Sequence, residues 1–438
     1  MKSLFPFDSS VVSQIRAELG IKKVSQASIR QMVQLVDKLQ RHFKVQFIRT
    51  EMGVPGFASP QIGVEAEIEA LRSGVSSVYP PIQGIEIFKN ELSRFAKLFM
   101  NIDIKPSGCI PTAGAMQASA VTFLVANRRD RQKDTTLLID PGFPVQKRQL
   151  GVFGMKYESF DIYDYRGEKL REKLESYLKK GNISSFLYSN PNNPSWICFT
   201  EKELAIIGEL ANKYDIVVVE DLAYFGMDFR RDYGKAGAEP YQASVANYTD
   251  NYVLLFSSSK IFSYAGQRLG AVMISDKLFA RSFDDLSSHF VSGRFGPAML
   301  QEAIYVTSAG ISHSAQAAVA AMLKAVNDSS FDFVGYLKEY GERAAIMKQH
   351  FLDAGFYLVY DKDEEEDLAD GFYFTVAFPG MNGEELLSEL IRYGISAITL
   401  DTTGSSRTDG LRICVSHTTL GRMYELATRL QLFAIEHK

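Results

Sequence analysis

Short apolar runs alternate with stretches of helical periodicity through the middle of the chain. The apolar runs are continuous and rich in Val, Ile and Leu, and they lie at 136–140, 184–188, 215–219, 252–257 and 271–275. Helical stretches separate them, for example 114–127, 168–180 and 201–213, the last opened by a Thr200/Glu203 capping box. Continuous apolar strands between helices are typical of a mainly parallel sheet covered on both faces, so the pattern predicts an α/β fold. Ligands of such sheets bind in loops at the carboxyl ends of the strands.

The N-terminal segment is predicted to be helical and amphipathic. Its apolar positions recur at helical spacing and are Ile29, Met32, Val33, Leu35, Val36 and Leu39. Residues 51–60 contain several Gly and Pro residues and are therefore expected to form a loop.

The pattern changes again towards the C-terminus and indicates a second, α+β domain. Long helices are predicted at 314–327 and 332–353, and strands near 371–378 and 411–415. A chain of 438 residues is longer than one hydrophobic core usually supports. We therefore expect a large domain at 76–315 and a small domain formed by 1–75 together with 316–438.

Composition and charge exclude several classes of partner. The formal net charge is -4, which does not favour nucleic acid or an anionic membrane. The stretch Met1–Asp8 meets an acidic residue too early for a secretory signal, and no run reaches the roughly 18 apolar residues of a membrane helix.

The three cysteines are far apart and have neither metal-ligand nor disulfide spacing, which suits a reducing cytoplasm; they are Cys109, Cys198 and Cys414. We interpret the acidic run 361–367 as a solvated loop rather than a metal site.

Lys260 is the residue whose surroundings say most about chemistry. It follows the buried strand 252–257 in a loop that also contains several hydroxyl groups and Arg268. An ammonium group that is hard to solvate has a lowered pKa, and a neutral amine is a nucleophile towards an aldehyde. Hydroxyl groups and a guanidinium beside it suit a phosphate. An aldehyde that carries a phosphate and is held by a lysine describes pyridoxal 5'-phosphate (PLP).

Two further strand ends carry polar side chains that suit this cofactor. Asp221 could be a buried anion that keeps a pyridine nitrogen protonated, or alternatively a helix N-cap. Tyr224 could donate a hydrogen bond to the cofactor's phenolic oxygen, or be a core tyrosine. Asn193 lies in the rigid turn Asn190-Pro-Asn-Asn-Pro194 and could donate to the same oxygen, although a plain turn explains it equally well.

Three other segments have a functional and an ordinary interpretation. The small residues of Pro111-Thr-Ala-Gly-Ala-Met-Gln117 lead into a helix, whose free N–H groups could bind phosphate or simply begin the helix. Arg412 interrupts an apolar strand and could bind a substrate carboxylate or form a structural ion pair. Phe143 could stack on a flat ring or be a core residue.

Together these segments resemble the class I/II aminotransferases, the fold-type I PLP enzymes related to aspartate aminotransferase. The resemblance runs from about Phe47 to the C-terminus, and its motifs appear in family order: Asn-Pro-x-x-Pro, Asp-x-Ala-Tyr, Ser-x-Ser-Lys, Gly-x-Arg-x-Gly and Leu-Arg-Ile. It implies a large PLP-binding domain with a mainly parallel seven-stranded sheet between helices, plus a smaller α+β domain. It also implies a homodimer that moves an amino group between an L-amino acid and a 2-oxo acid.

The resemblance assigns a role to each matching residue. Lys260 matches the lysine that forms the Schiff base with PLP and then moves the substrate proton, and Asp221 matches the partner of the ring nitrogen. Arg412 matches the anchor of the substrate α-carboxylate, and Gly53 a loop glycine near the substrate. The remaining matches hold the cofactor: Gly114, Ala115, Met116, Ser257, Ser259 and Arg268 at the phosphate, Phe143 on the ring, Asn193 and Tyr224 at the phenolic oxygen, and Tyr79 reaching the phosphate from the neighbouring subunit.

Departures from the family pattern bear on substrate and reaction. Ser195 and Trp196 replace the small pair that usually follows the Asn-Pro turn, so Trp196 is expected to reshape the edge of the pocket. Arg294 lies near the region where dicarboxylate-specific members carry a second arginine. A PLP lyase acting by β- or γ-elimination remains an alternative, because the same cofactor residues serve both reactions. A non-enzymatic sensor, an α-oxoamine synthase and a nicotinamide dehydrogenase fit less well, the last because no Gly-x-Gly-x-x-Gly follows a strand.

Overall fold

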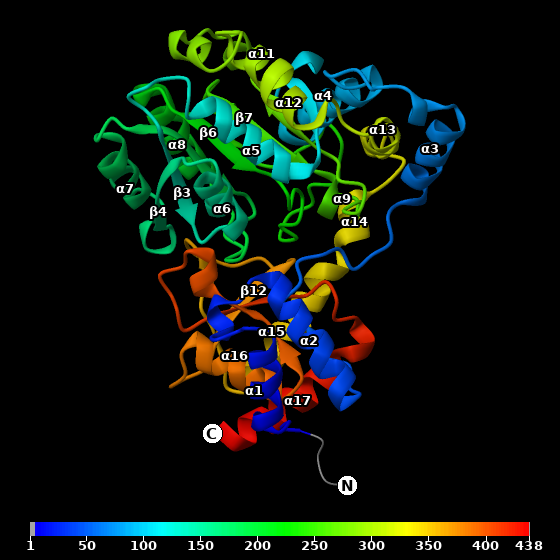
Figure 1. Cartoon of the computed structure of the whole chain (residues 1–438), viewed down its shortest axis with the longest axis vertical. Helices are drawn as coiled ribbons and strands as arrows, with labels where there is room; N and C mark the ends of the chain where they lie inside the picture. The colour runs from blue at the N-terminus through cyan, green and yellow to red at the C-terminus, as the bar shows by residue number, and fades with distance from the viewer. Residues whose placement is uncertain (1–4, 438) are drawn as a thin grey trace.

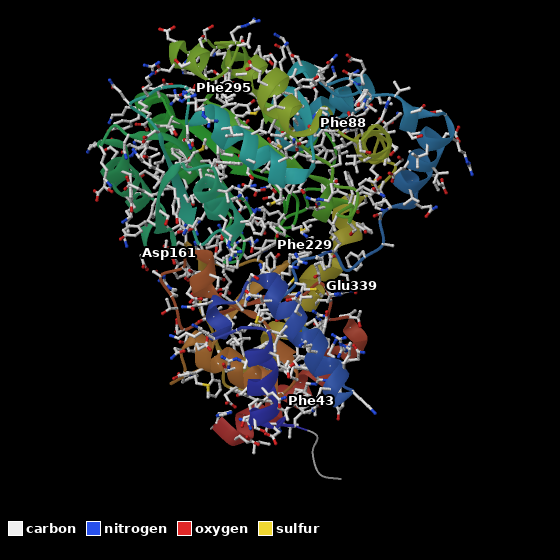
Figure 2. The ribbon with its side chains drawn as sticks, in the orientation of Figure 1. Phe43, Phe88, Asp161, Phe229, Phe295 and Glu339 are labelled. Carbon is white, nitrogen blue, oxygen red and sulfur yellow. The ribbon has the colours of Figure 1, made fainter. Side chains whose placement is uncertain are left out.

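The computed structural model describes residues 5–437, so part of the N-terminal stretch considered above lies outside the described residues. Figure 1 shows an upper body that contains the large sheet and a lower body that contains both ends of the chain. Figure 2 places Phe88 and Phe295 in the upper body and Phe43 in the lower one, with Asp161 and Phe229 near the junction. Within residues 5–437 every helix is too short or too polar to cross a bilayer.

The central sheet of the upper body has seven strands in the order β2-β8-β7-β6-β5-β3-β4. β8 runs antiparallel to both of its neighbours, and the other adjacent strands are parallel. All residues of β3, β5, β6 and β7 are buried, because helices cover both faces. The mainly parallel α/β sheet is thus confirmed. The strands are β2 (Cys109–Thr112), β3 (Thr135–Asp140), β4 (Lys156–Asp161), β5 (Ile183–Ser189), β6 (Val217–Asp221), β7 (Tyr252–Ser257) and β8 (Gly270–Ile274).

The helices of the upper body follow the predicted alternation. α8 begins with the predicted capping box, in which the Thr200 hydroxyl accepts from the Glu203 N–H and the Glu203 carboxylate accepts from the Thr200 N–H. In Figure 1, α5 crosses in front of the sheet, and it packs on β7 and β8. The helices are α3 (Gln61–Arg72), α4 (Glu86–Met100), α5 (Gly114–Ala126), α6 (Pro144–Val152), α7 (Lys169–Leu178), α8 (Glu201–Tyr214), α9 (Ser258–Ile261), α10 (Asp276–Ala280), α11 (Phe295–Pro297), α12 (Tyr305–Ser308) and α13 (His313–Asn327).

Most predicted boundaries differ from the structure by one or two residues, and two differences have a clear local cause. β6 begins at Val217 instead of 215, because Asp215 ends α8 in the left-handed conformation with φ 50°. The helix predicted at 332–353 is divided into α14 (Phe333–Leu337) and α15 (Glu339–Asp353) at Lys338. Lys338 keeps helical angles, φ -58° and ψ -31°, so the two helices still follow one another closely.

The lower body joins the two ends of the chain. β1 (Ile48–Arg49) pairs in parallel with β13 (Ile395–Ser396). The apolar face predicted for the N-terminal segment belongs to α2 (Ile29–Phe43), where Met32, Leu35, Val36 and Leu39 are buried. A four-stranded antiparallel sheet has the order β14-β15-β12-β9. The other elements are α1 (Ser9–Glu18), β9 (Tyr357–Leu358), β12 (Tyr373–Ala377), α16 (Gly383–Arg392), β14 (Ile398–Thr399), β15 (Leu411–Cys414) and α17 (Met423–His437).

The division of the chain into domains at 75 and 315 stays a prediction. α3 lies in the upper body in Figure 1 and packs extensively on α13. The predicted division assigns α3 and most of α13 to the small domain, whereas both helices lie in the upper body.

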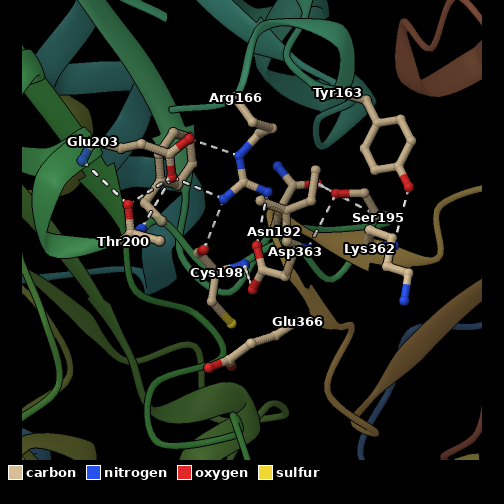
Figure 3. Close-up of polar contacts among 12 residues, drawn as sticks. Tyr163, Arg166, Asn192, Ser195, Cys198, Thr200, Glu203, Lys362, Asp363 and Glu366 are labelled. Carbon is tan, nitrogen blue, oxygen red and sulfur yellow. Dashed lines mark hydrogen bonds and ion pairs between the residues drawn. The ribbon is translucent and has the colours of Figure 1, made fainter. Parts of the chain in front are cut away.

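The acidic run 361–367 is exposed over most of its length, as expected of a solvated segment, but it is not an irregular loop and its Asp363 is buried. It forms the hairpin of β10 (Lys362–Asp363) and β11 (Glu366–Asp367). Asp363 is buried and accepts hydrogen bonds from Arg166 at 2.7 Å and from Arg230 at 2.8 Å. Figure 3 shows Arg166 between Asp363 and Glu203, so a carboxylate of the lower body meets arginines of the upper body. Among residues 5–437 no group of acidic, cysteine or histidine side chains is arranged to hold a metal ion.

Candidate functional site

A cavity of about 440 Å³ lies at the carboxyl ends of the central strands and is lined from both bodies. Of the residues to which the family resemblance assigns a role, all but Gly114 and Tyr79 line this cavity. Those lining it are Gly53, Ala115, Met116, Phe143, Asn193, Asp221, Tyr224, Ser257, Ser259, Lys260, Arg268 and Arg412. The fold thus brings together residues that are far apart in the sequence, such as Gly53 and Arg412, which are 359 positions apart.

Lys260 lies in α9, directly after β7. Burial lowers the pKa of its ammonium to about 8, and the nearby guanidinium groups of Arg412 and Arg268 act in the same direction. Its Nζ donates a hydrogen bond to the carbonyl oxygen of Gly53. A lysine with this pKa is partly neutral at physiological pH and can act as a nucleophile or a base.

Asp221 is the last residue of β6 and is buried. Its carboxylate accepts hydrogen bonds from Gln146 Nε2 at 3.2 Å and from the N–H of Ala223 at 3.1 Å. Burial raises the pKa of this carboxyl group to about 6 despite the two hydrogen bonds. A turn rather than a helix follows Asp221, so the helix N-cap alternative does not hold. A buried carboxylate without a cationic protein partner is suited to a cationic ligand.

Tyr224 belongs to a small network of polar groups above Asp221. Its hydroxyl lies 2.9 Å from the hydroxyl of Tyr373 and accepts a hydrogen bond from Asn193 Nδ2 at 3.4 Å. Burial raises the pKa of Tyr224 well above its usual value, and the neighbouring Tyr373 adds to this. Burial also raises the pKa of Tyr373, so both hydroxyls keep their protons at neutral pH; when Tyr373 donates to Tyr224, the Tyr224 hydroxyl is left to donate to a ligand oxygen.

The N-terminus of α5 and Arg268 form a site suited to an anion. Gly114 has φ +74°, and a Cβ atom there would lie 2.4 Å from Arg268 Nη2, so the guanidinium packs directly on the start of the helix. Ser257 and Ser259 line the same cavity. Free N–H groups, the helix dipole and a guanidinium together favour a phosphate.

Arg412 lies in β15 and is 1% exposed. It donates to the carbonyl oxygen of Glu51 at 2.7 Å and to Asn193 Oδ1 at 3.5 Å, whereas its Nε has no partner. Its guanidinium carbon lies 4.6 Å from the centre of the Tyr373 ring. Arg412 pairs with no acidic side chain within residues 5–437, so the alternative of a structural ion pair does not hold. An arginine buried in this way is suited to an anionic ligand.

Phe143 precedes α6 and is half-buried, with its ring at the cavity rather than in the core. Trp196 does not line the cavity; it is buried and packs edge-on against Tyr224 and Tyr373, with ring centres 5.4 Å and 6.1 Å apart. Trp196 thus packs against Tyr224 and Tyr373, two residues that line the cavity, without lining it itself. Arg294 precedes α11 and does not line the cavity. Tyr79 is 86% exposed and lies outside the cavity of its own chain.

The sequence analysis missed Gln146 and Tyr373. Gln146 lies one turn into α6 with no motif around it, and only its hydrogen bond to Asp221 reveals it. Tyr373 lies in an apolar strand where an aromatic residue is expected for packing alone. The structure places it beside Arg412, because β12 and β15 are neighbouring antiparallel strands, and the sequence carries no local signal of that pairing.

Comparisons with known proteins agree with this geometry. A family described as aminotransferase class I and II matches residues 51–430. The probable aspartate aminotransferase of Methanocaldococcus jannaschii is 27% identical over 53% of this chain and 58% of its own length. The glutamate-pyruvate aminotransferase AlaC of Escherichia coli is 29% identical over 56% of this chain and 58% of its own length. The matches therefore span less than two thirds of these relatives.

Solved structures show the same fold at lower identity. The aspartate aminotransferase of Thermus thermophilus with maleate has a TM-score of 0.73 and 16% identity, covering 93% of this chain and 97% of that chain. An aminotransferase from Mycobacterium tuberculosis has a TM-score of 0.76 and 16% identity, covering 93% of this chain and 96% of that chain. These structures establish the fold.

Proposed function

The chain belongs to the class I and II aminotransferase family, and we propose that it is a PLP-dependent enzyme that moves an amino group between an L-amino acid and a 2-oxo acid. The observation that carries this proposal is the presence of Lys260, Asp221 and Arg412 in one cavity, an amine with lowered pKa, a carboxyl with raised pKa and a buried guanidinium. Structural charges are usually paired, so three such groups together favour a functional site.

The residues present fit PLP. The start of α5, with Ala115 and Met116, would hold the phosphate together with Ser257, Ser259 and Arg268, and any side chain at Gly114 would disturb this site. Asp221 would face the ring nitrogen, whose positive charge suits a carboxylate that has no other cation. Phe143 would lie against the ring. Asn193 and Tyr224 would donate to the phenolic oxygen.

In this proposal the protein's side chains bind the substrate and move its proton. PLP, when bound, supplies an aldehyde and an electron-withdrawing ring that accepts electrons from the substrate's Cα–H bond. Arg412 binds the substrate α-carboxylate with guanidinium N–H groups that the protein holds weakly: Nε has no partner and Nη1 is 3.5 Å from Asn193 Oδ1, whereas Nη2 donates to the Glu51 carbonyl oxygen at 2.7 Å. Lys260 Nζ accepts the Cα proton and later releases it to complete the transfer of the amino group. Its lowered pKa leaves part of the amine neutral, and able to accept a proton, near neutral pH. Gly53 keeps its carbonyl oxygen at Lys260, and its missing side chain lets the Tyr373 hydroxyl approach closely.

A half-reaction assay tests the activity. The protein reconstituted with PLP is mixed with one amino acid while its visible absorbance is followed, and a 2-oxo acid is then added. We expect the absorbance to fall with release of the oxo acid and to return after the second addition. Release of ammonia and pyruvate from a single amino acid would instead support the elimination alternative. A protein that shows no visible absorbance with PLP would contradict the proposal.

We further propose a homodimer in a reducing cytoplasm. Tyr79 and Val78 are 86% and 62% exposed, which supports an interface in which Tyr79 of one subunit reaches the phosphate bound by the other. The three cysteines are buried free thiols, which supports the compartment. Sedimentation gives the oligomeric state, and Tyr79→Phe should weaken PLP retention without changing that state.

A further inference from the structure

We propose that Trp196 is a positioning residue that fixes Asn193 and the Tyr224–Tyr373 pair, and so sets the hydrogen bonds that the protein offers to the phenolic oxygen of PLP. This inference rests on the proposed function, because it concerns the groups proposed to meet that oxygen. Trp196 does not line the cavity and acts through its neighbours. Trp196, Tyr224 and Tyr373 are all buried within one chain, so their mutual contacts do not depend on a partner subunit.

The backbone of Trp196 has a conformation that favours glycine. Its φ is +67°, in the left-handed region, where a residue with a Cβ atom is strained. The indole ring is buried and its Nε1 has no hydrogen-bond partner. A strained residue persists where the surrounding structure determines its conformation, and such residues are frequent at functional sites. The packing of the ring, rather than a hydrogen bond, is therefore what this position contributes.

The indole ring packs between the two bodies of the molecule. Tyr224 of the upper body and Tyr373 of the lower body lie edge-on to it, with ring centres 5.4 Å and 6.1 Å away. The two tyrosine rings are themselves 5.4 Å apart, so the three rings form a closed triangle. A Cβ atom at Gly371 would lie 2.1 Å from the indole Cε2, so the indole also lies directly on the backbone of the lower body. A shift of either tyrosine towards the indole therefore requires the indole to move.

Tyr373 lies next to free space. It lines the cavity that contains Lys260 and also a second cavity of about 390 Å³, which Trp196 lines too. A ring that borders two cavities has fewer packing contacts to hold it than a ring in a filled core. The contact with Trp196 therefore restricts the position of the Tyr373 hydroxyl, which lies 2.9 Å from that of Tyr224.

Trp196 also closes the turn that carries Asn193. Its N–H donates to the Asn192 carbonyl oxygen at 2.9 Å, and the Asn192 N–H donates to the Ile197 carbonyl oxygen at 2.8 Å. Asn193 Nδ2 donates to the Tyr224 hydroxyl at 3.4 Å, which is long for a hydrogen bond. A small displacement of the turn is therefore enough to break this contact.

These donors determine how readily the phenolic oxygen of PLP carries a negative charge. A hydrogen bond donated to a phenolate oxygen stabilises its charge and lowers the pKa of the group. Donors that point elsewhere do not stabilise the charge. The pH at which the visible absorbance of the PLP-loaded protein changes therefore reports the position of Asn193 and Tyr224, whereas the free energy of unfolding does not.

Two substitutions at Trp196 test the inference on the PLP-loaded protein. Trp196→Gly removes the ring and the backbone strain, and Trp196→Phe keeps a smaller ring. In Trp196→Gly we expect the pH midpoint of the visible absorbance to rise by at least about half a unit, and kcat/KM to fall by at least about tenfold. Both changes should be smaller in Trp196→Phe. An unchanged midpoint in Trp196→Gly, with only the free energy of unfolding altered, overturns the inference and leaves Trp196 a structural residue.

Gly371→Ala displaces the ring while the tryptophan stays, so it provides the test even if Trp196→Gly does not fold. Gly371 is outside the left-handed region, so alanine adds only the overlap of its Cβ atom with the indole. Trp196 is the only tryptophan of the chain, so fluorescence emission reports its displacement. We expect the emission maximum to shift and the pH midpoint to rise, whereas Gly151→Ala, whose Cβ meets no atom within 4 Å, changes neither. An unchanged emission maximum, or a shifted one with an unchanged midpoint, overturns the inference.

The wild-type protein separates the failure of this inference from that of the proposed function. A wild-type protein that shows no visible absorbance with PLP contradicts the proposed function, and the inference with it. A wild-type protein that transfers amino groups, together with variants that keep its pH midpoint, contradicts the inference alone.

Discussion

The catalytic cavity and the cluster at the β10–β11 hairpin both enclose charged side chains, but only in the hairpin cluster is each charge paired with an opposite one. In the hairpin cluster, formed by Arg166, Glu203, Asp228, Arg230 and Asp363, each carboxylate has an arginine partner within 2.8 Å. Burial alone would raise the pKa of Glu203, but the hydrogen bonds and charge of Arg166, together with two backbone N–H donors, outweigh it and hold the pKa below its usual value. In the cavity, burial dominates at both Lys260 and Asp221.

The difference separates charges that hold the fold from charges that serve a ligand. A buried ion pair with full hydrogen bonding loses much stability when one partner is removed. A buried charge without a partner already destabilises the protein, and proteins keep such groups where a ligand or a reaction uses them. Replacing charged groups in the two regions should therefore change stability with opposite signs.

The largest expected effect is that of Lys260→Ala on turnover. The variant should keep the phosphate site and bind PLP, but lose about 10⁴-fold in kcat, because within residues 5–437 Lys260 is the only lysine that lines the cavity. Equilibrium binding of PLP and single-turnover kinetics with a reactive amino acid measure the two properties separately. Near-normal transfer by this variant would remove Lys260 from its proposed role.

The second prediction concerns the hairpin cluster. Asp363→Asn leaves Arg166 and Arg230 facing a neutral amide, so we expect a loss of about 4 kcal/mol in the free energy of unfolding. Urea unfolding measures it. Lys277→Ala, which breaks an exposed ion pair with Asp250, is the control and should leave the unfolding midpoint essentially unchanged.

Replacing an aspartate by an asparagine in the cavity, as in Asp221→Asn, should change the free energy of unfolding with the opposite sign. The pKa of Asp221 is about 6 in the folded protein against an ordinary 3.8, so the folded state holds this proton more tightly and loses stability as the pH rises from about 4 to 6. In protein prepared without PLP, Asp221→Asn should therefore raise the free energy of unfolding by about 3 kcal/mol at pH 8, and by less at pH 5. It should also weaken retention of PLP. A decrease in stability at pH 8 would contradict this account.

The contrast between the two regions also shows how far sequence alone reaches. The strands and Lys260 are predictable because continuous apolar runs and a lysine at a strand end are local features. Asp363 looks like one of several solvated acids, and its partners Arg166 and Arg230 lie 197 and 133 residues away. Tyr373 looks like a core residue, and only the assembled fold, in which β12 pairs with β15, shows that it lines the cavity. Contacts of this range depend on the assembled fold, so local pattern does not specify them.

The smallest expected effect is that of Tyr373→Phe, which removes the hydroxyl 2.9 Å from that of Tyr224. A neutral hydrogen bond contributes about 1 kcal/mol, so kcat/KM should fall by roughly tenfold or less. Since Tyr224 is proposed to donate to the phenolic oxygen of PLP, the pH at which the visible absorbance of the loaded protein changes should also shift. A purely structural role for Tyr373 would change stability and leave that titration unmoved.

A second substitution, at Gly53, tests the space that the Tyr373 hydroxyl fills independently of the hydrogen bond that it makes. A Cβ atom at Gly53 would lie 2.0 Å from this hydroxyl but 3.2 Å from the ring carbon that bears it. Gly53→Ala should thus be less harmful to kcat/KM in the Tyr373→Phe background than in the wild-type protein, because a severe overlap becomes a tight contact. Gly151→Ala is the matched control, since its Cβ meets no atom within 4 Å, and it should show no coupling to Tyr373. Additive effects of Gly53→Ala and Tyr373→Phe would mean that the loop moves away from the tyrosine, and that Gly53 is not fixed beside Lys260 by this contact.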